Sequence, residues 1–155
     1  MKKTLKAVSK TATKYISKSE QETHEIALKV LKSMPSGAVL CLYGQLGAGK
    51  TTFSKGIGMA FGIDALKMKS PTYTYIREIE HDGKKIFHCD FYRLEGKSHA
   101  ASEMLIQLQE QPHDLIIVEW PEFLEEKIPS HRTDVRLRVK GEREREIHVT
   151  HHDKK

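Results

Sequence analysis

The stretch Gly44-Gln45-Leu46-Gly47-Ala48-Gly49-Lys50-Thr51 fits the pattern G-x-x-x-x-G-K-[ST] at every fixed position. The continuously apolar segment 38–43 precedes this stretch, and a helical pattern over residues 50–61 follows it. A buried strand before the loop and a helix after it form the context in which this pattern binds phosphate. The stretch therefore predicts a phosphate-binding loop in an α/β protein, and a chance glycine-rich turn is the weaker interpretation.

The chemistry of this loop suits a nucleotide with several phosphates. Glycines let consecutive backbone N–H groups curl around a phosphate, where a side chain would intrude. We expect Lys50 to reach the β- and γ-phosphates, and the hydroxyl of Thr51 to join the coordination shell of Mg²⁺. P-loop proteins that bind GTP read guanine through an Asn-Lys-x-Asp motif, and this chain contains no asparagine. The expected nucleotide is therefore ATP.

A P-loop enzyme needs a further acidic group that holds the metal ion or positions the attacking water. The apolar segment 115–118 predicts a buried strand beside the loop strand, and Glu119 follows its carboxyl end. Asp90 follows the apolar segment 86–89 in the same way. Ligands of parallel sheets bind at the carboxyl ends of the strands, so Asp114, at the other end of its strand, is on the wrong side. Glu119 and Asp90 are both candidates, against the alternative of solvated acids at strand ends.

The rest of the chain completes an α/β pattern. Ser19 and Glu22 match a capping box that opens a helix, and Pro35-Ser36-Gly37 ends that helix. The other expected elements are a β-hairpin of residues 72–80 and 85–92, a helix from about residue 97 to 111, and strands 134–140 and 144–150 around Gly141. The predicted fold is P-loop NTPase-like, with a mostly parallel central sheet flanked by helices, a β-hairpin and antiparallel C-terminal strands.

Length and composition indicate one domain over residues 1–155, with flexible basic or polar ends at about 1–14 and 151–155. No apolar run approaches the ~20 residues that span a bilayer, and no apolar segment follows the lysine-rich N-terminus. Cys41 and Cys89 lie in apolar segments, which favours reduced, buried thiols. We expect a cytoplasmic protein with no membrane or DNA partner. The net charge of +5 permits RNA binding, although such charge runs usually only solvate a surface.

Four motifs follow one another along the chain: the loop with its flanks (residues 42–53), Ser70-Pro71-Thr72-Tyr73-Thr74, His88-Cys89-Asp90-Phe91-Tyr92-Arg93 and Val118-Glu119-Trp120-Pro121-Glu122. Taken together, these motifs resemble those of the TsaE family, the small ATPase of bacterial tRNA threonylcarbamoyladenosine synthesis, formerly called YjeE. The phosphate loop is shared by many families, whereas the combination of the other three is far more specific. The resemblance covers about residues 15–150.

The resemblance implies weak ATP hydrolysis within an assembly that contains TsaD and TsaB. In that family TsaD transfers the threonylcarbamoyl group to adenosine 37 of ANN-decoding tRNAs, and the resemblance implies that this chain resets TsaD between turnovers. Any contact with tRNA would then be indirect, through the assembly. The implied cofactors are ATP and Mg²⁺.

The resemblance also implies a role for each matched residue. Lys50, Glu119 and Asp90 would form the catalytic set, with Asp90 most closely tied to hydrolysis. The metal ligands would be Thr51, Glu119 and Asp90. Thr72 would lie in a switch-like loop near the γ-phosphate. The implied nucleotide contacts are Glu20, Gly44, Gln45, Leu46, Gly47, Ala48, Gly49, Lys50, Thr51, Thr52, Thr72, Trp120 and Gly141.

Two other functions use the same features. A small-metabolite kinase would need an arginine-bearing lid, and the C-terminal arginines alternate along a strand instead. A nucleotide-gated RNA-binding module would need stacking aromatic residues among its basic residues, and none interleave with them. His88 alternates with Asp90 along one strand face, and we expect it to support that acid rather than to bind zinc.

Overall fold

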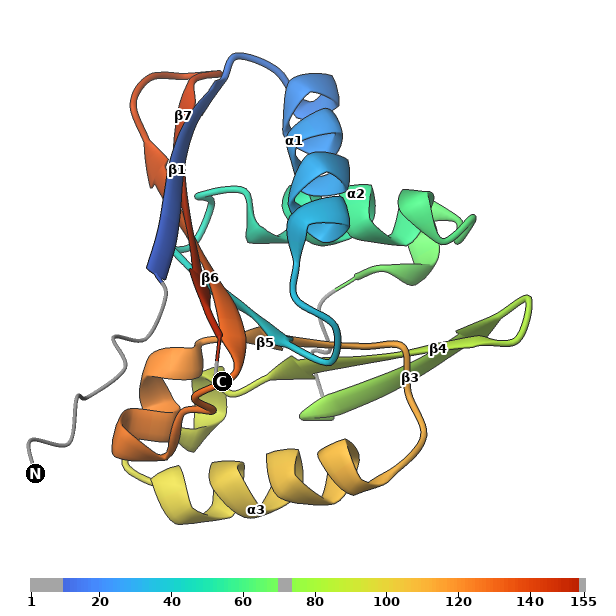
Figure 1. Cartoon of the computed structure of the whole chain (residues 1–155). Helices are drawn as coiled ribbons and strands as arrows, with labels where there is room; N and C mark the ends of the chain where they lie inside the picture. The colour runs from blue at the N-terminus through green and yellow to red at the C-terminus, as the bar shows by residue number, and fades with distance from the viewer. Residues whose placement is uncertain (1–9, 70–73, 154–155) are drawn as a thin grey trace, which may run out of the picture.

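The strand that precedes the phosphate loop, β2 (Val39–Tyr43), lies in the middle of a seven-stranded sheet. The computed structural model describes residues 10–69 and 74–153. Leu40, Cys41 and Leu42 are fully buried, because helices cover both faces of the sheet at this point (Figure 1). This central position fixes the loop that follows β2 at the edge of the sheet where the parallel strands end.

Four neighbouring strands form the parallel part of the sheet. They are β6 (Arg132–Val139), β2, β5 (Leu115–Glu119) and β4 (Lys84–Asp90), in this spatial order. The remaining strands pair antiparallel at the two sides: β7 (Arg145–His152) and β1 (Lys10–Ser17) beyond β6, and β3 (Ile76–His81) beyond β4. The predicted α/β fold, with its hairpin and antiparallel C-terminal strands, is confirmed.

Two helical layers sandwich the sheet (Figure 1). Helices α1 (Glu20–Ser33) and α2 (Lys50–Ala60) cover one face, and α3 (Ser98–Glu110) covers the other together with the 3₁₀ segment η3 (Pro121–Lys127). Alternate residues of β2 point to the two layers, so the apolar core is divided into two clusters. Short 3₁₀ turns, η1 (Ala65–Lys67) and η2 (Tyr92–Leu94), complete the described elements.

The first helix begins where the capping pattern predicts. The hydroxyl of Ser19 accepts a hydrogen bond from the Glu22 N–H at 3.1 Å, and the Glu22 carboxylate accepts one from the Lys18 N–H at 2.6 Å. The first bond satisfies a backbone donor that the first turn of a helix leaves without an intrahelical partner, and the second ties the residue before the N-cap to that turn. They also fix the N-terminus of α1 beside the phosphate loop, which brings Glu20 close to it.

The prediction of flexible ends is wrong for residues 10–14 and 151–152. β1 pairs with β7 along its whole length, from Lys10 opposite His152 to Ser17 opposite Arg145. Its lysines suggested a solvated tail, but the strand is held by backbone hydrogen bonds to the edge of the sheet, which do not depend on side-chain polarity. The other residues of the predicted ends, 1–9 and 154–155, lie outside the described part.

The structure also bears on the predicted hairpin, on the two cysteines and on membrane-spanning segments. The hairpin strands are shorter than predicted, because residues 74 and 75 precede β3 and Tyr92 lies in η2. Cys41 and Cys89 are free, buried thiols, and burial raises the pKa of Cys89 to about 12. Within residues 10–69 and 74–153, every helix is too short or too polar to cross a bilayer.

Helices α1 and α2 approach closely at Gly56. A Cβ atom at Gly56 would lie 2.8 Å from both the Cβ of Ala27 and the Cα of His24, so a neighbouring backbone would have to move. We expect Gly56→Ala to destabilise the protein. Overpacking costs about 1–3 kcal/mol, which outweighs the ~1 kcal/mol gain in helix propensity. Thermal unfolding measures the loss, and Met59→Ala, on the exposed side of the same helix, is the control. Equal melting temperatures for wild type and Gly56→Ala would contradict the close helix contact.

Candidate functional site

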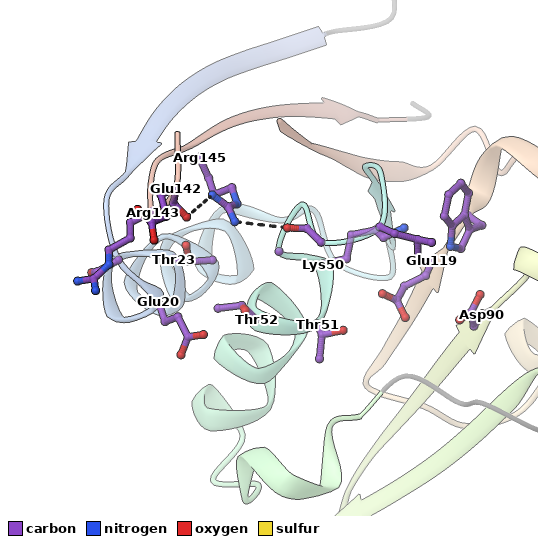
Figure 2. A pocket seen from close by; sticks show the side chains of 15 residues that line it. Glu20, Thr23, Lys50, Thr51, Thr52, Asp90, Glu119, Glu142, Arg143 and Arg145 are labelled. Carbon is purple, nitrogen blue, oxygen red and sulfur yellow. Dashed lines mark hydrogen bonds between the residues drawn. The ribbon is translucent and has the colours of Figure 1, made fainter. Parts of the chain in front are cut away.

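A cavity of about 720 Å³ opens at the edge where the parallel strands end. It is bounded by the N-terminus of α1, the glycine-rich loop with the start of α2, the ends of β4 and β5, and the turn between β6 and β7 (Figure 2). The lining residues are Ser19, Glu20, Thr23, Leu46, Gly47, Gly49, Lys50, Thr51, Thr52, Asp90, Glu119, Trp120, Glu142, Arg143 and Arg145.

The loop presents backbone donors to this cavity. Gly49 caps α2 with φ of 106°, a left-handed conformation that glycine adopts without steric cost. The Gly49 carbonyl accepts the first intrahelical bond, from the Phe53 N–H at 2.9 Å. The N–H groups of Lys50, Thr51 and Thr52 therefore precede the hydrogen-bonded ladder of the helix, where the helix dipole is positive. This arrangement suits an anion such as a phosphate.

The amine of Lys50 is held inside the loop. Its Nζ donates a hydrogen bond to the Gly44 carbonyl at 2.7 Å and lies 3.7 Å from the ring centroid of Trp120. The residue is buried, and this burial lowers the pKa of its amine, while the nearby carboxylates of Glu119, Glu122 and Asp90 oppose the shift. Lys50 therefore provides a poorly hydrated positive charge beside two acids.

Glu119 and Asp90 lie side by side at the ends of β5 and β4, as register partners. The Asp90 Oδ1 accepts a hydrogen bond from the Tyr92 N–H at 2.9 Å. Burial raises the pKa of Asp90, and the Glu119 carboxylate adds to the effect, while the Tyr92 N–H, Lys50 and His88 oppose it. Two acids that share one site with a lysine form a candidate constellation for metal-assisted phosphate chemistry.

Asp114 lies at the opposite edge of the sheet, as its position before β5 predicts. Its Oδ2 accepts a hydrogen bond from the Lys85 N–H at 2.8 Å, and its Oδ1 lies 3.6 Å from the Lys84 amine. These contacts join β5 to the hairpin, so Asp114 has a structural role away from the cavity.

His88 does not contact the acid that the sequence analysis assigned to it. Its Nε2 lies 3.1 Å from the Oε2 of Glu119, and both side chains are buried. His88 still supports Asp90 electrostatically, since it opposes the rise in the pKa of Asp90. Its hydrogen bond goes to Glu119, which the parallel register places diagonally across from His88 on the neighbouring strand.

Aromatic rings form the wall next to Lys50. Trp120 has a left-handed backbone (φ 57°) and stacks on Phe123 with ring centroids 5.7 Å apart. The ring of Tyr92 also packs against the indole, with centroids 5.0 Å apart and an angle of 54° between the rings. The loop that follows Glu119 thus fixes the indole ring over the Lys50 amine.

The turn between β6 and β7 contributes residues that the sequence analysis missed or assigned less specifically. The guanidinium of Arg145 donates hydrogen bonds to the Gly141 and Glu144 carbonyls at 3.1 Å. Figure 2 shows its further bonds, to the Glu142 carbonyl at 3.5 Å and to the Gly47 carbonyl at 3.4 Å. Arg145 therefore fastens the turn to the phosphate loop. The alternation of charged and apolar residues predicted the strand, but no local pattern shows that this arginine reaches a loop 98 positions away in sequence.

Most of the predicted nucleotide contacts gather in the cavity. Those that line it are Glu20, Leu46, Gly47, Gly49, Lys50, Thr51, Thr52 and Trp120. Gly44, Gln45 and Ala48 belong to the same loop without lining the cavity, and Gly141 is replaced there by Glu142 and Arg143. Thr72 lies outside the described residues. The roles of all these residues stay predictions.

The side chains of the cavity could hold a metal ion only together with oxygen atoms of a bound phosphate or of water. Among the described residues, no group of three or more His, Cys, Asp and Glu side chains can hold a metal ion by itself. Mg²⁺ usually takes one or two carboxylates together with phosphate oxygens and water. Glu119, Asp90 and the exposed Thr51 at the start of α2 provide such a partial set.

The family assignment agrees with this geometry. A family model described as "Threonylcarbamoyl adenosine biosynthesis protein TsaE" matches residues 17–147. The chain belongs to the TsaE family. The match spans every residue that lines the cavity, from Ser19 of the helix cap to Arg145 of β7.

Individual TsaE proteins are similar over most of their length. The tRNA threonylcarbamoyladenosine biosynthesis protein TsaE of Bacillus subtilis is 37% identical over 84% of this chain and 80% of its own. The protein of the same name from Treponema pallidum is 31% identical over 86% of this chain and 97% of its own. The crystal structure of Bacillus subtilis YdiB superposes with a TM-score of 0.72 at 30% identity, over 94% of this chain and 88% of that one.

The raised pKa of Asp90 predicts a pH-dependent stability. Above this pKa the folded state holds a half-buried carboxylate, which is less stable there than in the unfolded chain. The wild type should therefore gain stability as the pH falls through the pKa of Asp90 in the folded state. The gain is complete once the pH is below the ordinary pKa of an aspartate in the unfolded chain. Asp90→Asn keeps an oxygen acceptor for the Tyr92 N–H and removes the charge.

We expect Asp90→Asn to melt at a higher temperature than the wild type at roughly pH 8, with a difference that shrinks toward acid pH. Circular dichroism melts over a pH series measure it. Glu95→Gln, which removes an exposed carboxylate, should show no such trend. A difference between Asp90→Asn and wild type that is constant with pH would contradict the interpretation that partial burial destabilises the Asp90 carboxylate.

Proposed function

We propose that this chain binds ATP, hydrolyses it slowly with Mg²⁺, and serves tRNA threonylcarbamoyladenosine biosynthesis. The observation that supports this function best is the joint placement of a glycine-rich loop, a buried lysine and two carboxylates around one cavity. The printed names of the TsaE relatives state the biosynthetic process for those proteins, and we extend it to this chain through the family.

The phosphates of ATP would lie against the start of α2. The N–H groups of residues 50–52 and the charge of Lys50 would bind the β- and γ-phosphates, which displaces the Lys50 amine from the Gly44 carbonyl. The base and ribose would extend along the cavity toward Glu20 and Arg143, which lie on the side of the cavity away from Asp90 (Figure 2). Selection of ATP over GTP rests on the absence of the asparagine-containing guanine motif.

Mg²⁺ would be held by Thr51 and Glu119, with Asp90 as a direct or water-mediated ligand. When bound, the ion supplies positive charge that offsets the charge developing on the phosphate oxygens. The chain's own residues bind and orient: Lys50 neutralises the phosphates, and the Tyr92 N–H fixes the direction of the Asp90 carboxylate.

Hydrolysis would proceed by attack of water on the γ-phosphorus, with cleavage of the bond to the β,γ-bridging oxygen and release of ADP and phosphate. The raised pKa of Asp90 makes its carboxylate a better proton acceptor for the attacking water. We assign the catalytic roles to Asp90, Lys50 and Glu119.

Partners are expected to stimulate this reaction. Beside the cavity, Leu46 at the loop tip is 76% exposed and Tyr92 is 51% exposed, so apolar side chains are available to a protein that docks there. Exclusion of water around the phosphates would then depend on the complex. We propose TsaD and TsaB as these partners, in the cytoplasm, with tRNA contacted through the assembly and with no membrane or DNA partner.

A small-metabolite kinase is the main alternative function, because a kinase needs arginines over the phosphates and Arg143 and Arg145 line the cavity. The Arg145 guanidinium, however, is engaged by backbone carbonyls of its own turn and of the loop. Release of free phosphate without an acceptor, compared with transfer of labelled phosphate to a panel of metabolites, separates the two activities. Salt-dependent binding of tRNA to the isolated chain would favour the RNA-binding module instead.

Lys50→Met tests the phosphate site. The methionine keeps an apolar stem against Trp120 but removes the charge, so ATP affinity should fall by about 10–100-fold, as expected for charged hydrogen bonds, while the melting temperature changes little. Isothermal titration calorimetry measures the affinity. The control is Lys55→Met, one and a half turns further along α2, because it removes the same positive charge. Wild-type affinity in Lys50→Met would refute the assignment of the phosphate loop.

Asp90→Asn tests the hydrolytic role separately from binding. The variant should bind ATP about as tightly as the wild type and lose roughly 10²–10⁴-fold in single-turnover hydrolysis with TsaD and TsaB present, as expected for a general base. The same assay on the lone chain checks the stimulation. Full activity of Asp90→Asn in the assembly would exclude this role, and fast hydrolysis by the lone chain would exclude the need for partners.

A further inference from the structure

The side chain of His88 is fully buried in β4, beneath the candidate metal site. Its Nε2 lies 3.1 Å from the Oε2 of Glu119, whose side chain is 3% exposed. Glu119 lines the cavity, whereas His88 does not. The hydrogen bond of the histidine therefore acts on the cavity through the carboxylate of Glu119.

The pairing defines which nitrogen of His88 carries hydrogen. An ionised carboxylate only accepts hydrogen bonds, so Nε2 of His88 is the donor to Glu119. In the described part of the chain, Nδ1 is buried and has no hydrogen-bond partner. A buried polar atom without a partner destabilises a fold. An apolar residue would fill this position in the core without that cost, so packing alone does not explain a histidine here.

We propose that His88 is a positioning residue, which holds the Glu119 carboxylate in the orientation that binds Mg²⁺ beside Thr51. This proposal rests on the proposed function. A carboxylate on a flexible side chain at a strand end has several rotamers, and one fixed hydrogen bond from a rigid, buried ring selects among them. Residues that orient metal ligands in this way commonly change metal affinity by about 10–100-fold when they are replaced.

The test compares two amides at position 88. In His88→Gln the amide nitrogen lies near the place of the histidine Nε2 and can donate to Glu119. In His88→Asn the amide nitrogen lies near the place of Nδ1, and the shorter side chain does not reach the carboxylate of Glu119. Both variants bury a polar group of similar chemistry, so they differ mainly in the hydrogen bond. Cys89→Ala, a buried change at the next position of β4 that points to the other layer, controls for loss of core packing.

The measurement is ATP binding by calorimetry across a Mg²⁺ series, and again with a chelator. His88→Asn should raise the Mg²⁺ concentration for half-maximal stimulation of binding by about 10–100-fold, with unchanged affinity in the chelator. His88→Gln and Cys89→Ala should keep the wild-type Mg²⁺ dependence. His88→Leu serves as a second variant without the donor, should His88→Asn not fold.

Three results would overturn the positioning role: a wild-type Mg²⁺ dependence in His88→Asn, an equal loss of affinity with and without Mg²⁺, or a failure of His88→Gln as large as that of His88→Asn. A wild-type protein that does not bind ATP, or binds it independently of Mg²⁺, would instead refute the proposed function itself. The two failures are therefore distinguishable.

Discussion

The burial of β2 on both faces, between β5 and β6, is the constraint on which the site depends. Since β2, β5 and β4 run parallel, their carboxyl ends meet at one edge of the sheet. A glycine-rich loop follows β2, and β5 and β4 each end at an acidic residue. One lysine and two carboxylates that are far apart in sequence therefore line the same cavity. A change in strand order would separate these groups even if every local structure were kept.

The local signals in the sequence predicted the parts of the site that follow from strand and helix ends. The loop pattern located Lys50, and the apolar runs located Glu119 and Asp90, because a run of buried residues reveals where a strand stops. The capping box located the start of α1 for the same reason. These features depend on residues within a few positions of each other, which a single sequence displays directly.

Features that depend on register were not predictable in this way. The contact of His88 with Glu119 instead of Asp90 follows from the alignment of two strands, and the bond from Arg145 to Gly47 follows from the packing of a turn against a distant loop. β1 was read as part of a flexible end because its pairing with β7 leaves little trace in side-chain polarity. Hydrogen bonds between residues far apart in sequence can be identified only once the three-dimensional arrangement of the strands and turns is known.

The pairing of β1 with β7 also determines where the protein can be modified. Lys10 lies opposite His152, so both ends of the described chain meet at one side of the sheet. From there β1 runs toward Ser17, next to the helix cap that lines the cavity, which places the Lys10–His152 pair at the far edge. A fluorophore or a surface tether attached near either residue would therefore be separated from the cavity by the length of the strands, and would leave the cavity open for optical or force measurements.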